Sequence, residues 1–305
     1  MSHEHDHSAH SHAPPNNNAA FAIGVVLNLG FVVAEVFYGL AAHSLALISD
    51  AGHNLSDVFC LLLAWGAMQL TKTAPTSRRT YGWRRSSIFA ALINAVILLV
   101  VVGGITVEAI RRFAQPQEVS GGTVMAVAAI GIVINGVSAL LFLSGRKRDL
   151  NMKGAFLHMA GDAAVSAGVV VAAFAIKMTG WQWLDPAVSL AIGVVIVWGT
   201  WGLLRESINL SMDAVPAGID PHAVESYLAN LAGVTAVHDL HIWAMSTTEV
   251  ALTVHLVMEE TPRSDLFLHD VSEALREQFG IGHATTQIEC GDCEHDCRQA
   301  PVHVV

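Results

Sequence analysis

Two pairs of a histidine followed four residues later by an aspartate lie within long apolar stretches of the chain. The first pair is His53 and Asp57, and the second pair is His158 and Asp162. A spacing of four residues puts both side chains of a pair on one face of a helix. Two such faces turned toward each other would offer two imidazoles and two carboxylates. That set suits tetrahedral binding of a zinc-like divalent ion.

A structural role for these polar residues is the alternative to metal binding. An ionisable side chain at the centre of a bilayer costs roughly 2.5–3.5 kcal/mol or more unless it faces a cavity or a partner. A hydrogen-bonded polar seam between helices could explain the first pair alone, but the repeat of the spacing favours metal binding. Asp50 precedes His53 by about one helical turn. It could line an access path or have only a structural role.

Six stretches are apolar and long enough to cross a bilayer as helices, which takes about 20 residues each. They cover residues 19–41, 45–70, 86–111, 122–143, 154–177 and 186–208. Apolar residues make up 53% of the chain and charged residues only 14%, against about 25% charged residues in soluble domains. We therefore expect a six-helix transmembrane domain over residues 19–208, preceded by a disordered, His-rich tail over residues 1–18.

The distribution of basic residues among the loops predicts the orientation in the membrane. The loops after the second and fourth stretches hold nine basic residues, and the opposite side holds three. Loops rich in Lys and Arg stay in the cytoplasm. We therefore expect both basic loops, and with six spans both termini, to be cytoplasmic. No signal peptide is evident, and we expect a multi-pass protein of a bacterial inner membrane.

Residues 209–305 have the composition of an acidic soluble domain, with fifteen acidic and three basic residues. A nucleic-acid partner would require a basic face, so none is expected, and the charge fits a domain that attracts divalent cations. We expect a helix from Pro221 to about residue 231, strands over 234–244 and 249–258, a helix over 263–279 and a strand over 284–289. This αββαβ order predicts a two-layer α+β domain over residues 209–289.

Four motifs occur in order along the chain: residues 49–57 (SDAGHNLSD), 79–83 (RTYGW), 158–162 (HMAGD) and 237–243 (VHDLHIW). From residue 19 to 289 the chain resembles the cation diffusion facilitator family, and it is most similar to the zinc-transporter branch. Members of that family are homodimeric metal/proton antiporters that export zinc, with a metallochaperone-like cytoplasmic domain that dimerises. The resemblance implies a transporter and not an enzyme, with zinc as cargo and protons as counter-ion. It implies that the transport ligands are His53, Asp57, His158 and Asp162.

The same resemblance implies a regulatory metal site in the cytoplasmic domain. Its ligands would be His238, His255, His283 and Glu289. Some family members carry another metal site of Asp and His in the loop between spans two and three. Residues 71–85 contain neither type here, so we expect no site there, and the arginines of this loop could pair with acids of the C-terminal domain. Strand alternation predicts that His238 and His241 lie on opposite faces, and that His241 shares a core or interface face with Trp243.

Both terminal segments are rich in residue types that bind metal. The C-terminal tail, residues 290–305, carries Cys290, Cys293 and Cys297, and the first two cysteines form half of a tetrahedral zinc site. Closely spaced cysteines on a reducing cytosolic side bind metal more often than they form disulfides, although the tail could also be unliganded. The N-terminal tail is expected either to collect metal loosely or to be inert. Its histidines are His3, His5, His7, His10 and His12.

Charge balance indicates how metal and protons would be coupled. Zinc with two aspartates and two neutral imidazoles sums to zero charge, whereas two carboxylates without the metal cannot comfortably stay ionised together. Metal and protons therefore compete, and His53 and His158 are the expected proton carriers because histidine titrates near neutral pH. The expected partners are a divalent metal ion, membrane lipid and a second copy of the chain. Alternatives are a membrane metal sensor, a transporter preferring cobalt or cadmium, and an intramembrane metalloenzyme, which would need an open coordination position.

Overall fold

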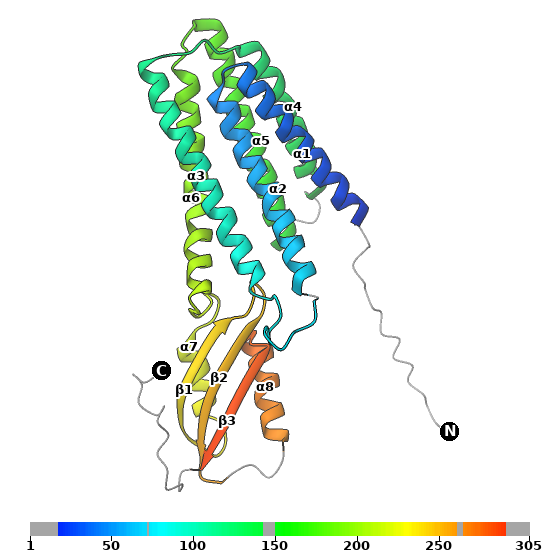
Figure 1. Ribbon diagram of the computed structural model, residues 1–305, viewed down its shortest axis with the longest axis vertical. Coiled ribbons are helices and arrows are strands. Elements are labelled where there is room, and N and C mark those ends of the chain that lie inside the picture. The colour runs from blue at the N-terminus through cyan, green and yellow to red at the C-terminus, as the bar shows by residue number, and fades with distance from the viewer. Residues whose placement is uncertain (1–17, 72, 143–149, 261–264, 291–305) are drawn as a thin grey trace, which may run out of the picture.

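A bundle of long helices and a small α+β domain at one end of it make up the described part of the chain (Figure 1). The computed structural model describes residues 18–71, 73–142, 150–260 and 265–290, and it leaves some side chains within the helices undescribed. The bundle helices are α1 (Asn18–Ala41), α2 (Leu45–Thr71), α3 (Ser86–Ala114), α4 (Gly121–Phe142), α5 (Leu150–Thr179) and α6 (Leu184–Ser211). Each of the six predicted spans is therefore a helix.

The outer surface of the bundle is apolar, as a lipid environment requires. Four helices are long and apolar enough to cross a membrane, counted over the described residues. They are α3 and α6 over their whole length, Gly121–Leu140 of α4 and Met159–Thr179 of α5. Only 28–33% of these stretches is buried inside the protein. Trp198 is 85% exposed and Val100 is 69% exposed. Apolar surface of this extent, on helices of this length, fits burial in hydrocarbon.

Helix α2 lies at the centre of the bundle and contacts α1, α3, α5 and α6. Helix α4 packs along α5 and also contacts α1. Gly131 of α4 lies close to both neighbours, because an added Cβ would come within 2.9 Å of the Phe31 ring and 3.1 Å of Ser166 Oγ. Glycine therefore lets α4 reach α1 and α5 together, as small residues commonly do between membrane helices.

The C-terminal domain has the predicted αββαβ order. Its elements are α7 (Pro221–Ala229), β1 (Val234–Ala244), β2 (Val250–Met258), α8 (Leu266–Phe279) and β3 (His283–Cys290). The Asp220 side chain accepts the His222 N–H at 3.0 Å and caps α7, and Pro221 occupies the first helical position. Helix α8 ends at Gly280, whose φ of 71° is in the left-handed region that glycine adopts freely.

The sheet has one face against helices and one face without them. Its strand order is β1-β2-β3, with β1 antiparallel and β3 parallel to β2. Ile242, Leu252 and Leu256 pack with the apolar faces of α7 and α8, which lie behind the sheet in Figure 1. Alternate residues point the other way, and no described helix covers that face.

A bulge in β1 changes which residues share the uncovered face. His238 pairs with His255 and His241 pairs with Thr253, so three steps along β1 match two steps along β2. Asp239 within the bulge has φ 53°, a conformation that aspartate tolerates better than most residues. The extra residue reverses the alternation, so His238 and His241 lie on the same face. The prediction of opposite faces is wrong, whereas His241 and Trp243 do share a face.

The loop between α2 and α3 contacts the C-terminal domain through ion pairs. Arg84 Nη1 lies 3.1 Å from Glu249 Oε1, and Arg85 pairs with Asp213. The Ser87 hydroxyl accepts a hydrogen bond from the Thr247 N–H at 3.1 Å. The predicted pairing between arginines of this loop and acids of the C-terminal domain is thereby confirmed.

Candidate metal centres

Helices α2 and α5 carry the two predicted histidine–aspartate pairs and bring one residue of each pair together. His53 lies on α2 and Asp162 on α5, and His53 Nε2 is 3.1 Å from Asp162 Oδ1. Asp162 is 3% exposed. The remaining members, Asp57 on α2 and His158 on α5, have side chains outside those that the structure describes. An imidazole and a carboxylate from different helices thus meet inside the bundle.

Further polar side chains line the interior next to this contact. Asp50 is fully buried and accepts a hydrogen bond from Ser166 Oγ at 2.9 Å. On α1, the fully buried Glu35 accepts a hydrogen bond from Asn54 Nδ2 at 2.9 Å. The polar interior therefore extends from α5 through α2 to α1. Sequence reasoning assigned no role to Glu35, although an acid within a predicted span was the available signal.

The start of α2 is held by a carboxylate from another helix. Asp185, near the start of α6, accepts hydrogen bonds from Ser44 Oγ at 2.5 Å, from the Leu45 N–H at 2.7 Å and from the Ala46 N–H at 3.3 Å. These N–H groups have no partner within their own helix, and a negative charge there is favourable. Asp185 therefore anchors the helix that carries His53. Sequence reasoning did not identify this role, because the donors are far from Asp185 along the chain.

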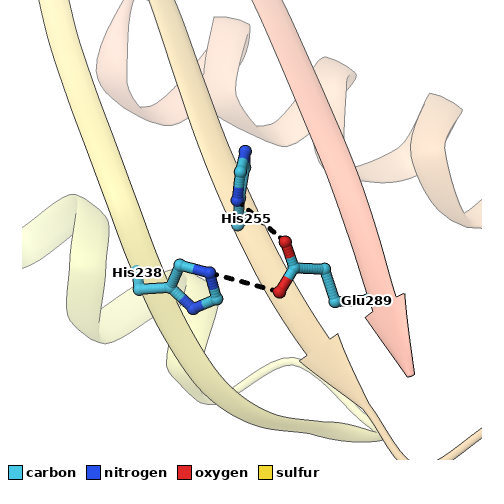
Figure 2. A group of neighbouring side chains, drawn as sticks. All are labelled: His238, His255 and Glu289. Carbon is cyan, nitrogen blue, oxygen red and sulfur yellow. Dashed lines mark ion pairs between the residues drawn. The ribbon is translucent and has the colours of Figure 1, made fainter. Parts of the chain in front are cut away.

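A second centre lies on the uncovered face of the sheet, with one residue from each strand. Figure 2 shows the Glu289 carboxylate of β3 between two imidazoles, His238 of β1 and His255 of β2. Glu289 Oε2 is 3.3 Å from His238 Nε2, and Oε1 is 2.9 Å from His255 Nδ1. The ligand atoms of all three residues lie within 4.8 Å of one another. Two histidines and a carboxylate are a donor set that suits zinc, so these residues fit a metal ion.

An aspartate of β1 contacts one histidine of this cluster and a neighbouring histidine. Asp239 Oδ2 is 3.4 Å from His255 Nε2, and Oδ1 is 3.0 Å from His241 Nε2. Histidines that bind metal through one ring nitrogen commonly donate the other N–H to a carboxylate, which fixes the ring orientation. Asp239 can do this for His255 while Nδ1 faces Glu289. It was missed in the sequence because its direction depends on the bulge in β1.

The structure does not bring His283 to this cluster within one protomer. His283 pairs with Ala251 at the start of β3, whereas Glu289 pairs with Val257 near its end. At about 3.3 Å per residue, the six intervening steps separate the two residues by roughly 20 Å. The His283 ring instead meets the Tyr81 ring edge-on, with 5.8 Å between centroids.

The predicted ligands of the two tails are mostly outside the described residues. Cys290 is described at the end of β3, and its Sγ lies 3.9 Å from the Glu259 carbonyl oxygen. Cys293, Cys297 and the five N-terminal histidines lie outside the described residues.

The chain resembles known proteins over nearly its whole length. Residues 21–210 match a family described as the cation efflux transmembrane domain, and residues 216–290 match the cytoplasmic domain of cation efflux proteins. The metal cation efflux system protein CzcD of Cupriavidus metallidurans is 36% identical over 293 residues, which cover 96% of this chain and 91% of that protein. The zinc transporter ZitB of Escherichia coli is 36% identical over 303 residues, covering 97% and 96%.

Two further matches complete the comparison. The cadmium, cobalt and zinc/H(+)-K(+) antiporter of Bacillus subtilis is 32% identical over 292 residues, covering 94% of both chains. A solved structure of the metal-bound C-terminal domain of the CzcD transporter is 35% identical, with a TM-score of 0.22. It covers 23% of this chain and 99% of that one.

Proposed function

The chain belongs to the cation efflux family and is a multi-pass membrane protein that exports metal cations, and we propose that its cargo is zinc and that protons move the other way. The observation that carries this proposal is the contact between His53 and Asp162, which joins α2 and α5 inside the bundle at 3.1 Å. A nitrogen and an oxygen ligand from different helices suit zinc better than a purely hard cation.

We propose that Asp57 and His158 complete the transport site with His53 and Asp162. Each lies about one helical turn from its partner, so both pairs can contribute to the same centre. Bound zinc would be neutralised by the two carboxylates. When zinc leaves, protons on the histidines or aspartates relieve the repulsion between those carboxylates. A site that opens alternately to the two sides of the membrane would then exchange one cation for the other.

Zinc flux in proteoliposomes tests the ligand assignment. We expect Asp162→Ala and Asp57→Ala each to abolish zinc flux, because each removes a ligand and leaves the metal charge uncompensated. Asp270→Ala, an exposed position on α8, is the matched control and should transport normally. Near-normal flux from either ligand variant would overturn the four-ligand site.

The same vesicles test the cargo and the counter-ion. Zinc should be exported faster than cobalt or cadmium at equal concentration, and an internal pH dye should report proton movement opposite to zinc. Faster cobalt or cadmium flux would contradict the proposed preference. Zinc flux without a pH change, at a clamped membrane potential, would contradict proton exchange. A chain that binds zinc but transports no metal would be the sensor considered above.

We propose that zinc binding at His238, His255 and Glu289 regulates transport by drawing two protomers together. The region from residue 209 to 305 carries fifteen acidic residues, so two such domains repel until cations neutralise part of this charge. Thiolates of Cys290, Cys293 and Cys297 could add ligands from the tail. The N-terminal histidines are proposed to collect metal.

Zinc dependence of transport tests this regulation. We expect His238→Ala with His255→Ala to raise the zinc concentration for half-maximal flux while flux at saturating zinc persists. His222→Ala, an exposed histidine on α7, is the matched control. An unchanged half-maximal concentration would show that these histidines have no regulatory role.

We propose that both termini are cytoplasmic. The loop between α2 and α3 carries Arg84 and Arg85 and contacts the C-terminal domain. This basic loop and the domain therefore lie at the same end of the bundle (Figure 1), which agrees with the preference of basic loops for the cytoplasm. Single cysteines introduced at residues 73–85 and labelled from either side of the vesicle membrane test the orientation of this loop.

A further inference from the structure

Two buried carboxyl groups that the proposed transport site does not use lie next to each other between α1 and α2. Glu35 and Asp50 are both fully buried. One oxygen of each has a conventional donor, since Asn54 Nδ2 donates to Glu35 Oε2 and Ser166 Oγ donates to Asp50 Oδ2, both at 2.9 Å. The pair is therefore held in place from α2 and α5.

The other two oxygens of the pair, Glu35 Oε1 and Asp50 Oδ1, are buried without a hydrogen-bond donor among the described residues. The two carboxyl groups are nevertheless neighbours that interact electrostatically. Ionised carboxylates can only accept hydrogen bonds, so two of them cannot satisfy one another. One bound proton makes either group a donor to the other and satisfies both buried atoms.

The electrostatic surroundings also favour one proton on this pair. Helix α4, which packs against α1, contains no ionisable residue, and the ionisable residues of α1 are Glu35 and Tyr38. On α2 the next ionisable group is His53, and on α5 it is Asp162, which contacts His53. No lysine or arginine in α1, α2 or α4 is available to neutralise the pair. Two adjacent carboxylates in such an interior do not both ionise.

We propose that Glu35 and Asp50 together bind one proton that is exchanged for zinc during transport. Asp50 lies about one helical turn before His53. Zinc at the transport site would place positive charge near the pair, and a nearby positive charge favours an ionised carboxyl group. The proton leaves the pair for the aqueous side that is open when zinc binds, and a proton from the opposite side replaces it after zinc departs. This proton site is additional to the histidines of the transport site and rests on the proposed zinc–proton exchange.

Glu35→Gln is the decisive variant because it reproduces the protonated pair without a proton that can leave. The glutamine oxygen can still accept from Asn54, and its amide N–H can donate to Asp50. Glu35→Asp is the matched control, since it shortens the side chain but keeps a carboxyl group that can bind and release the proton. If Glu35 has only a structural role, both variants should affect folding or rate without changing the number of protons exchanged.

The measurement is the zinc gradient that vesicles reach at equilibrium when a pH difference is imposed and the membrane potential is clamped at zero. Each exchanged proton multiplies the zinc ratio by roughly tenfold per pH unit. We expect the ratio for Glu35→Gln to be about tenfold smaller per pH unit than for the wild type, and that for Glu35→Asp to equal the wild type. An unchanged ratio in Glu35→Gln would overturn the proposal. A wild type that forms no zinc gradient would instead overturn the proton exchange itself.

A binding measurement covers the case in which Glu35→Gln transports too slowly to reach equilibrium. Calorimetric zinc titrations of the full chain in buffers of different ionisation enthalpy give the number of protons released per zinc bound. We expect Glu35→Gln to release about one proton fewer than the wild type, with the same number of zinc ions bound. Equal proton release would overturn the proposal. Loss of a bound zinc ion would also overturn it, because it would identify the pair as a metal site.

Discussion

Replacing Asp239 by asparagine should weaken zinc binding at the His238–His255–Glu289 cluster by about 10–100-fold. Asp239 Oδ2 lies 3.4 Å from His255 Nε2, and its side chain is only 8% exposed. His255 presents its other nitrogen to Glu289 at 2.9 Å. Without the carboxylate, the ring loses the group that orients it and makes it more basic. The expected loss corresponds to about 1.4–2.7 kcal/mol of binding free energy.

Asparagine is the informative substitution because of the backbone at this position. Asp239 has φ 53°, and asparagine tolerates this left-handed conformation as well as aspartate does. Alanine would add roughly 1–2 kcal/mol of backbone strain and would mix a folding effect with the binding effect. The asparagine side chain would also keep an oxygen that can accept a hydrogen bond from His255 Nε2, so the change removes mainly the negative charge.

The assay is a calorimetric zinc titration of the purified full chain carrying Asp162→Ala, which removes a proposed transport ligand. Asp239→Asn is compared with Asp270→Asn, an exposed position on α8 that serves as the control. The Kd should rise for the first variant only, with equal thermal unfolding temperatures for the two proteins. A Kd that is unchanged by Asp239→Asn would refute the idea that Asp239 orients His255 for metal binding.

Three further predictions concern the transport site, the anchor of α2 and the junction between domains. His53→Asp should broaden transport toward cadmium or manganese, because a harder ligand replaces nitrogen and adds negative charge; an unchanged preference in competition flux assays would show that selectivity lies elsewhere. Asp185→Ala should lower the unfolding temperature, because the Ser44 hydroxyl and two N–H groups of α2 lose their buried acceptor. Each donor left without an acceptor costs about 1–3 kcal/mol of stability. An unfolding curve equal to that of the wild type would contradict the proposal that Asp185 anchors α2. Arg84→Glu should weaken the contact between the α2–α3 loop and the C-terminal domain, and Glu249→Arg in the same chain should restore it. The coupling free energy should be at most about 1 kcal/mol, because the ion pair is exposed. A double-mutant cycle in unfolding temperature with no coupling would show that the ion pair contributes nothing to stability.

The helices of the bundle were predictable because a membrane span is a local property of the sequence. A helix that crosses hydrocarbon must pair its own backbone groups and needs about 20 mostly apolar residues in a row. The second stretch was expected over residues 45–70, and α2 is Leu45–Thr71. The C-terminal elements were also predictable from local signals, such as Pro221 at the start of α7 and Gly280 after α8.

The composition of the candidate centres was only partly predictable. The spacing of His53 to Asp57 and of His158 to Asp162 assigns each pair to one helical face, so a shared metal site could be expected from local geometry. The contacts that build the interior join distant parts of the chain. His53 and Asp162 are 109 residues apart, and Asp50 and Ser166 are 116 residues apart. Only the packing of α1, α2 and α5 decides that Glu35 faces this interior.

The three-stranded sheet shows the limit of predicting side-chain direction from the local sequence pattern. Alternation along a strand is a reliable local pattern, and it correctly predicted that His241 and Trp243 share a face. It failed between His238 and His241, because one extra residue in β1 is accommodated by a bulge. The sequence by itself determined which elements form and which residue types they carry. The tertiary structure decided how β1 pairs with β2, and this pairing places Asp239 next to His255. The physical reason is that side-chain direction in a sheet depends on the partner strand as well as on the strand's own residues.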